Sequence, residues 1–350
     1  MDFESANLAK RKDLRHTNWR LDMTVAPGLM YHKDDLAVGA SYIFRKTSES
    51  VEAEQVGTAE SSYYAFLDKG MMYGVYSVWS GSGLHLKDAG VERFPVKDFS
   101  NGAALQIQYK GIFAEVEYLH TQGSIGEKEY IWFNFPGNEA SVLLGYTHKR
   151  GKARHNARLH LNYRHMNLDE RVLEKVSENG VTTVYDHGSN RILSEERWTL
   201  HPEYEYITKA VELRADASLK WEGSLGSQMY PYVAYQSMIT WKAGAEVILH
   251  IGDIDIEAMA SFGKGDVHEE TSTANGSSGV QTSLFRLQDW YERHMEYLTA
   301  PRLETGLGFR YSFNKGIYIK AEGTWMQGFG LKHLTEAGRF GAAFRIGYDF

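Results

Sequence analysis

Apolar side chains recur at every second position through most of this chain, and that spacing restricts its fold more than any other feature. Residues 19–31 are apolar at every odd position, with Arg20, Asp22 and Thr24 among the residues between them. A period of two places apolar and polar side chains on opposite faces of a β-strand, whereas a helix has a period near 3.6. The chain is therefore predicted to be all-β, with one apolar and one polar face in each strand.

The same alternation returns towards the C-terminus in pairs of segments joined by short polar turns. Residues 105–109 and 112–118, for example, flank a turn at 110–111. With a weak first strand at 3–8, the count is about fourteen, and bacterial single-chain barrels have an even number of strands. The pattern predicts a transmembrane antiparallel up-and-down β-barrel, with residues 1–350 forming a single outer-membrane domain.

The connections between the predicted strands alternate between tight turns and longer polar segments. The long ones include 51–99, 170–197 and 266–294. Short periplasmic turns and long extracellular loops are typical of outer-membrane barrels. Within the first loop, the apolar cluster at 63–67 is expected to fold into the mouth as a plug, and docking of a partner is the alternative.

Composition agrees with a barrel and excludes several other classes. Mean hydropathy is −0.43 and no stretch approaches the ~20 apolar residues of a transmembrane helix, but alternating faces hide a barrel from such averages. The absence of cysteine suits an oxidising periplasm and excludes thiolate chemistry. A net charge of −7 does not favour nucleic acid. The first twenty residues contain no apolar segment of a signal peptide. Either the peptide has been removed or the chain starts inside a longer sequence, and truncation at the N-terminus is the expectation.

Aromatic residues on the apolar face fall near the two ends of the predicted strands. Amphipathic rings gather at both interfaces of a bilayer, and a β-sandwich core would not produce two such groups. The expected girdles are Trp19, Trp198, Trp221, Trp241 and Trp325 near the long connections, and Tyr31, Tyr109, Tyr146, Tyr206 and Phe350 near the short turns.

The polar face carries charges of both signs, which a barrel would place on its lumen wall. One interpretation is an ion-selective pore or a path for a polar substrate. The preferred one is a ladder of paired charges, because both signs occur on the same strands and no ring of one sign is apparent. The candidate lumen residues are Arg20, Asp22, Glu115, Glu117, Arg158, Arg164, His201, Glu203, Arg214, Asp216, Lys242, Asp255, Glu257, Arg310, Lys320 and Glu322.

Turn geometry fixes the register of a hairpin, so two cross-strand pairs can be predicted. A two-residue turn at 208–209 would place Glu203 opposite Arg214 on the lumen wall. A turn at 252–253 would place His250 opposite Asp255.

Two parts of the sequence resemble known proteins. The final residues FRIGYDF, which end in Phe350, resemble the C-terminal signal that the outer-membrane assembly machinery recognises. The stretches KRKDLRHTNWRLDMTVAPGLMYH and AEQVGTAESSYYAFLDKGMMYG resemble an uncharacterised family of outer-membrane β-barrels from the Bacteroidota. Members of that family carry additional N-terminal sequence. The resemblance implies the fold and a location in the outer membrane of a Gram-negative bacterium, and it supplies no catalytic residues.

Three functions remain open from the sequence. The preferred one is a pore or transport barrel for small polar solutes. The second is a subunit of a secretion or surface-attachment machine that binds partners through its loops. The third is an outer-membrane hydrolase, for which His120 near Ser124 and His165 near Asp169 are weak candidates among fourteen histidines. No catalytic residue, metal site or cofactor is assigned, and the expected partners are outer-membrane lipid and the assembly machinery.

Overall fold

The computed structural model describes most of the chain, and all structural statements below refer to those residues. They are residues 2–9, 15–54, 62–68, 76–82, 94–127, 130–229, 232–272, 287–313 and 316–348.

One antiparallel sheet contains all the strands except β5 (Ser62–Asp68) and β6 (Tyr76–Ser82), which pair with each other. The only helix among the described residues is α2 (Leu287–Thr299). The strands of the main sheet are β1 (Asp2–Ala9), β2 (Arg15–Val25), β3 (Gly28–Lys33), β4 (Leu36–Glu54), β7 (Phe94–Tyr109), β8 (Ile112–Glu127), β9 (Tyr130–Asn134), β10 (Gly137–Arg150), β11 (Ala153–Glu178), β12 (Val181–Ile207), β13 (Val211–Met229), β14 (Tyr232–Ile251), β15 (Ile254–Ser272), β16 (Arg302–Ser312), β17 (Ile317–Gly328) and β18 (Gly338–Tyr348).

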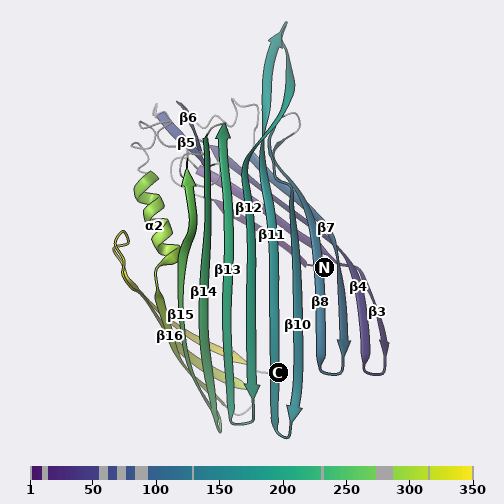
Figure 1. Ribbon diagram of the computed structural model, residues 1–350, viewed down its shortest axis with the longest axis vertical. Coiled ribbons are helices and arrows are strands. Elements are labelled where there is room, and N and C mark those ends of the chain that lie inside the picture. Colours follow the sequence, from purple (N-terminus) through teal and green to yellow (C-terminus); the bar gives the residue numbers. More distant parts are fainter. Residues whose placement is uncertain are drawn as a thin grey trace.

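The topology is up-and-down, with fourteen strands along the main path. Each strand pairs with the next in the order β1-β2-β4-β7-β8-β10-β11-β12-β13-β14-β15-β16-β17-β18, while β3 pairs with β4, and β9 with β8 and β11. Figure 1 shows the sheet curving as a wall, with tight turns at the lower end and β5, β6, α2 and a projecting β11–β12 hairpin at the upper end. The predicted fold class, an all-β up-and-down barrel with short turns at one end, is confirmed. Within the described residues, no pairing joins β1 to β18.

The register gathers apolar side chains from neighbouring strands on the outer wall. Leu213 of β13 lies opposite Val247, which lies opposite Ala258, which in turn lies opposite Leu307 of β16. Directly opposed residues of an antiparallel pair share one face of the sheet. Leu307 is 72% exposed, so no other described part of the chain covers this face there. No helix in the described part of the chain is long and apolar enough to cross a membrane.

Close packing occurs instead on the inner wall, where β4, β7 and β8 meet. Ile43, Ala104 and Leu119 form a buried apolar cluster there. Gly102 of β7 lies beneath Leu119, and a Cβ at this position would come 1.9 Å from the backbone oxygen of Tyr118. Only a glycine lets the two strands approach this closely.

The turn between β12 and β13 corrects the predicted register. The Thr208 hydroxyl accepts hydrogen bonds from the backbone N–H groups of Ala210 (3.3 Å) and Val211 (3.0 Å), and the Thr208 N–H donates to the Val211 carbonyl at 2.8 Å. Such a threonine turn fixes the chain locally, so the two central residues are Lys209 and Ala210. The turn therefore lies one residue later than predicted.

The predicted pairing of Glu203 with Arg214 is wrong as a result. Glu203 lies opposite Asp216, and Arg214 lies opposite Glu205. The sum of opposed residue numbers changes by two, and the period of a strand is two, so every side chain keeps its face. By contrast, the predicted pairing of His250 with Asp255 is present.

Two segments predicted as loops contain regular structure. Residues 170–197 belong to β11 and β12, whose hairpin turns at Asn179 and Gly180 with positive φ angles of 52° and 78°. The connection at 266–294 begins as the upper part of β15 and ends within α2. Both segments are predicted as loops because they lack the sharp apolar alternation of a wall strand.

The connection at 51–99 contains the β5–β6 hairpin, and the upper ends of β4 and β7 extend into it. The predicted apolar plug at 63–67 lies on β5, where side-chain placement falls outside the described residues. Its inward orientation stays a prediction.

The close approach at Gly102 gives a testable expectation. Replacement Gly102→Ala should lower the free energy of unfolding by about 2–3 kcal/mol, because the added methyl group meets backbone that cannot move away. The matched control is Gly145→Ala on β10, where the nearest atom to an added Cβ is 3.6 Å away, and its effect should stay within about 0.5 kcal/mol. Urea unfolding in detergent micelles, followed by tryptophan fluorescence, measures both. Equal losses for the two variants would contradict this account of the β7–β8 contact.

Candidate functional site

Ion pairs cover the inner wall of the barrel, and the densest group surrounds Arg214 of β13. Its guanidinium lies 3.0 Å from the carboxylate of Glu246, 3.2 Å from Glu212 and 3.8 Å from Glu205. The three carboxylates come from three adjacent strands, because the register places β12 and β14 on either side of β13. One cation therefore neutralises part of a local excess of negative charge.

A second group lies beside it on β11, β12 and β13. The carboxylate of Glu203 is 3.7 Å from the Arg158 guanidinium and 3.6 Å from the His201 ring. His201 is also 3.9 Å from Asp216. Glu203 and Arg214 thus both find charged neighbours on the inner wall, although not each other.

A third group occupies β15, β17 and β18. The Lys320 ammonium lies 2.7 Å from Glu257 and 3.3 Å from Glu322, and Glu322 also accepts from Arg345 at 2.5 Å. Lys320 is 19% exposed, so this is the most enclosed of the three groups.

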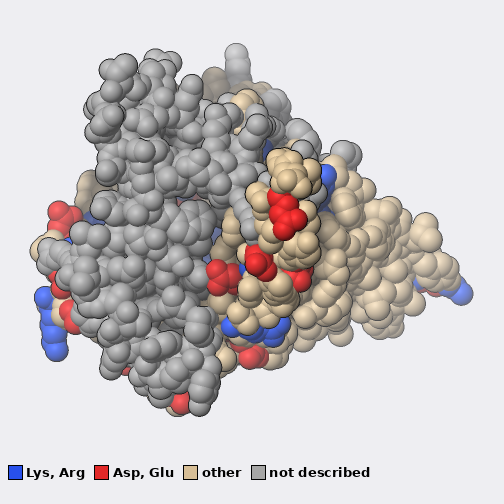
Figure 2. All heavy atoms as spheres, turned by 90° about the horizontal axis from the view of Figure 1, so that it is seen from above, with Lys and Arg blue, Asp and Glu red and all other residues tan. Residues whose placement is uncertain are grey.

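The remaining candidate lumen residues also have identifiable neighbours. They pair as follows: Arg20 with Asp22 at 2.7 Å, Arg164 with Glu139 at 3.2 Å, Lys242 with Glu304 at 2.7 Å, His250 with Asp255 at 2.7 Å, Glu115 with Gln106 by a hydrogen bond, and Arg310 with the Tyr318 ring at 4.1 Å, while Glu117 lies opposite Ala104 and Ser141. Most of these side chains are partly exposed, and exposed ion pairs add little to stability. The pairs affect the electrostatic potential of the wall, because positive and negative side chains alternate along it. Figure 2, which looks onto the upper end, likewise shows acidic and basic side chains close together in the described part.

The predicted girdle residues lie on the opposite, apolar face, and most are open to the surroundings. Phe350 falls outside the described residues. Trp19, Trp198, Trp241, Trp325, Tyr31, Tyr109 and Tyr146 are exposed, whereas Trp221 and Tyr206 are half-buried. The register places Trp198 directly opposite Trp221.

Helix α2 packs against the inner wall at the upper end. Gln236 of β14 donates from its side-chain amide to the Tyr291 hydroxyl at 2.7 Å and lies 3.3 Å from the Met295 sulfur. Gly265 of β15 lets the helix approach, since a Cβ there would be 3.0 Å from the Cα of Thr299. The helix thus lies on the lumen side of β14 and β15.

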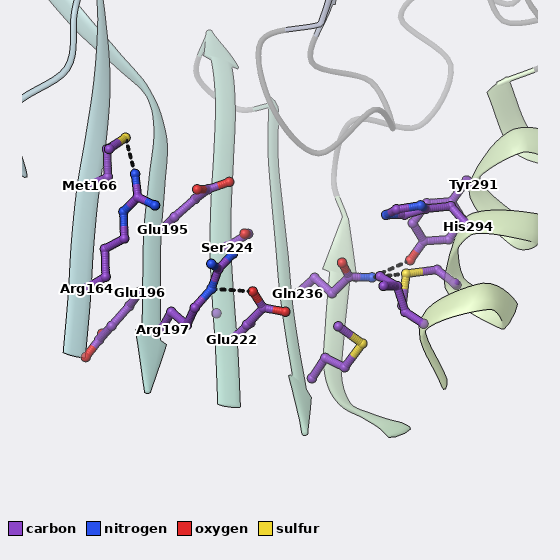
Figure 3. A pocket seen from close by; sticks show the side chains of 14 residues that line it. Arg164, Met166, Glu195, Glu196, Arg197, Glu222, Ser224, Gln236, Tyr291 and His294 are labelled. Atoms are coloured by element: carbon purple, nitrogen blue, oxygen red, sulfur yellow. Dashed lines mark hydrogen bonds and ion pairs between the residues drawn. The ribbon is translucent and has the colours of Figure 1, made fainter. Parts of the chain in front are cut away.

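A cavity of about 210 Å³ separates α2 from β11, β12 and β13. Figure 3 shows Glu195, Arg197 and Glu222 on one side of the cavity and Tyr291 of α2 on the other, with Gln236 of β14 directed towards Tyr291. The Arg197 guanidinium donates to Glu222 at 2.6 Å. This is a polar cavity at the mouth of the barrel, with charged groups on β12 and β13, and with the thioethers of Met238 and Met295 nearer to α2.

Glu296 holds the far side of α2 to the connection between β17 and β18. Its carboxylate accepts hydrogen bonds from the backbone N–H groups of Lys332, His333 (2.8 Å) and Leu334 (2.6 Å). Desolvation acts to raise the pKa of Glu296, but these three N–H groups outweigh it and hold the pKa below its ordinary value of 4.5. We call this contact the Glu296 latch.

Neither α2 nor the cavity is predicted from the sequence pattern. A signal was present, since Tyr291, Met295 and Leu298 recur at the spacing of one helix face. The strong turn and loop character of the preceding residues hid it.

The structure does not form the suggested hydrolase pairs. The His120 ring bonds to Asn138 at 2.9 Å, and the His165 ring to Asn167 at 3.1 Å. Asp169 is engaged by Arg191 instead, at 2.9 Å. Within the described residues there is also no group of three or more His, Asp or Glu side chains suited to a metal ion.

Residues 1–350 match a family of unknown function, DUF6850. The chain belongs to this family. No curated protein matches its sequence.

Several solved structures are similar to this chain. The ferric citrate transporter FecA in its unliganded form is 10% identical with a TM-score of 0.44, covering 93% of this chain and 50% of its own. The siderophore receptor PiuA from Acinetobacter baumannii is 8% identical with a TM-score of 0.45, covering 89% and 50%. OmpT of Vibrio cholerae is 10% identical with a TM-score of 0.33, covering 93% and 84%. The chain spans half the length of the first two.

The Glu296 latch should be lost in acid. Because folding lowers the pKa of this carboxyl, its stabilisation is complete above pH 4.5 and disappears as the pH falls through the lower, folded value. Replacement Glu296→Gln should have the same effect at neutral pH, because a neutral amide accepts backbone hydrogen bonds more weakly than a carboxylate. We expect amide hydrogen exchange at 332–334 to accelerate about tenfold in this variant, equivalent to about 1.4 kcal/mol.

The control is Glu336→Gln, which removes one negative charge from the connection that Glu296 contacts. It should leave exchange at 332–334 unchanged. Exchange that is insensitive both to Glu296→Gln and to acid would show that the latch does not hold this connection.

Proposed function

We propose that this protein is an integral outer-membrane β-barrel whose water-filled lumen admits small polar solutes, with α2 narrowing its mouth. The observation that carries the proposal is the contrast between the two faces of one sheet. Large apolar side chains such as Leu105, Leu307 and Phe344 are 62–72% exposed on the outside, while paired charges cover the inside.

Lipid is the surrounding that this outer face requires. Apolar surface without a protein partner is unfavourable in water by about 25 cal/mol per Å², and soluble monomers rarely expose patches of this extent. The exposed tryptophans and tyrosines fit the two interfaces of a bilayer. We include in the proposal that the terminal Phe350 is read by the assembly machinery, and that the protein comes from a bacterium of the Bacteroidota.

The inner wall supports solute passage without strong selection by charge. Positive and negative side chains alternate along this wall, whereas selective channels present rings of charges of one sign. Helix α2 and the Glu296 latch reduce the opening at the mouth. We therefore expect passage to be restricted by the size of the solute.

Conductance across a planar bilayer tests this function directly. The purified protein should produce discrete ohmic steps with cation and anion permeabilities that differ less than about threefold. Protein that inserts in the bilayer, as shown by protease protection, but gives no steps would contradict a pore.

Arg214 provides a sharper prediction within the same experiment. Replacement Arg214→Gln removes the cation that serves Glu205, Glu212 and Glu246, so the wall gains uncompensated negative charge. The channel should become cation-selective, with the permeability ratio moving at least threefold towards cations. The control Lys152→Gln removes one positive charge from the turn between β10 and β11, outside the lumen, and should leave the ratio unchanged. A ratio unaffected by Arg214→Gln would place this group away from the conducting path.

A second candidate function is supported by the β11–β12 hairpin. Pairing of β12 with β13 begins at Leu193, so residues 171–192 form a two-stranded ribbon that projects beyond the wall (Figure 1). Arg171 with Asp186 and Glu174 with His187 link its strands. A ribbon with two open edges can bind another chain by strand addition, as a subunit of a surface machine would require. Replacing 172–190 with a short turn should abolish co-purification of such a partner and leave conductance intact.

A further inference from the structure

We propose that the mouth cavity beside α2 binds a zwitterionic dipeptide with an apolar side chain. The inference deepens the proposed function and rests on it, because the lumen is the route by which such a solute would reach the cavity. Three features of the cavity carry it: a cation and a carboxylate at peptide spacing, spare hydrogen-bonding capacity on both, and an apolar floor.

Arg197 and Glu195 supply the two charges. They are two residues apart on β12, so their side chains leave the same face of the strand with Cα atoms roughly 6.6 Å apart. Figure 3 shows both directed from β12 towards α2. An extended dipeptide spans at most about 7 Å between its ends, which matches this separation.

Both groups retain the capacity to bind a ligand. Glu222 takes the Nε donor of Arg197 at 2.6 Å, and a guanidinium has four further N–H donors, which suit a carboxylate. Glu195 is exposed and has no hydrogen bond or ion pair with any other residue that the structure describes. It therefore suits the ammonium group of a peptide.

The opposite side of the cavity is apolar and adaptable. Met238 of β14 and Met295 and Leu298 of α2 line it, and Met238 is only 6% exposed. Unbranched thioethers adjust to side chains of differing shape. A free sugar or an inorganic anion would leave this surface without a partner, whereas the side chain of a leucine or methionine would cover it.

The volume sets the size of the ligand. A space of about 210 Å³ takes a dipeptide and excludes a long peptide unless its ends project into the lumen. Gln236 holds α2 in place through Tyr291, so the cavity exists before the ligand arrives and little reorganisation opposes binding.

Isothermal titration calorimetry on the full chain in detergent micelles tests the site. The probes are Ala-Leu, its N-acetyl form, its C-terminal amide, and Ala-Ser. We expect Ala-Leu to bind and each of the other three to bind at least tenfold more weakly, because each loses one of the three interactions. In the variant Arg197→Gln, Ala-Leu should also weaken at least tenfold, and amidation should have no further effect.

The matched controls are Arg158→Gln and Glu203→Gln, which remove the same charges from the wall below the cavity. They should keep the affinity for Ala-Leu. No binding of Ala-Leu to the native chain, or equal binding of the zwitterionic and blocked dipeptides, would overturn the inference. If Arg197→Gln fails to fold, the comparison of probes on the native chain still decides.

The binding experiment separates this inference from the proposed function. Binding in micelles together with a silent bilayer would refute conduction and keep the site. Ohmic steps with no binding of any dipeptide would keep the pore and refute the site.

Discussion

The structure depends on one constraint: a single-layer sheet has two faces, and each must meet a different surrounding. Within the part of the chain that the structure describes, no second layer covers the outer wall, where Leu105 and Leu307 are 62% and 72% exposed. The strand period of two then assigns every other residue to a polar inner wall. The composition of the chain, the pairing of its charges and the position of its helix all follow from this division.

On the inner wall, the separation of polar and apolar faces is kept even where the strand register differs from the predicted one. The β12–β13 turn lies one residue later than a simple two-residue loop would place it, yet Arg214 still finds carboxylates, at Glu205 and Glu246. A wall with alternating charges tolerates such a shift because each side chain has charged neighbours on both sides. The shift leaves every side chain on its original face of the sheet. A bilayer would require this division between an apolar and a polar face.

Much of the wall could be predicted from sequence because its information is local. Alternation fixes the strands, and turn residues at 110–111 and 252–253 fix two hairpins and the contact of His250 with Asp255. The position of the turn at Thr208 could not be predicted. The alternation of the flanking strands is the same whether the two central residues are 208–209 or 209–210, and the hydrogen bonds of the Thr208 hydroxyl select the second. The face of each residue was predictable even where its partner was not.

The mouth could not be predicted in the same way, because its structure comes from contacts between distant segments. Helix α2 gains its place from Gln236, more than fifty residues before it, and from backbone groups at 332–334. Gly265 is needed for the helix to approach, but as a strand glycine it has no distinctive neighbours in sequence. The inner cavity is therefore formed by tertiary packing, and no sequence motif predicts it.

Site-specific labelling tests the central claim, that the two faces of the sheet meet lipid and water. The chain has no cysteine, so single replacements can be made cleanly at Ala217 and Ala258 of the outer face and at Ser218 and Met259 of the inner face. In lipid vesicles, Ser218→Cys and Met259→Cys should react with a water-soluble maleimide, while Ala217→Cys and Ala258→Cys should resist it and, labelled beforehand with a fluorophore, be quenched by brominated lipid. Equal reactivity at all four positions, or quenching of the inner pair by lipid, would contradict the account.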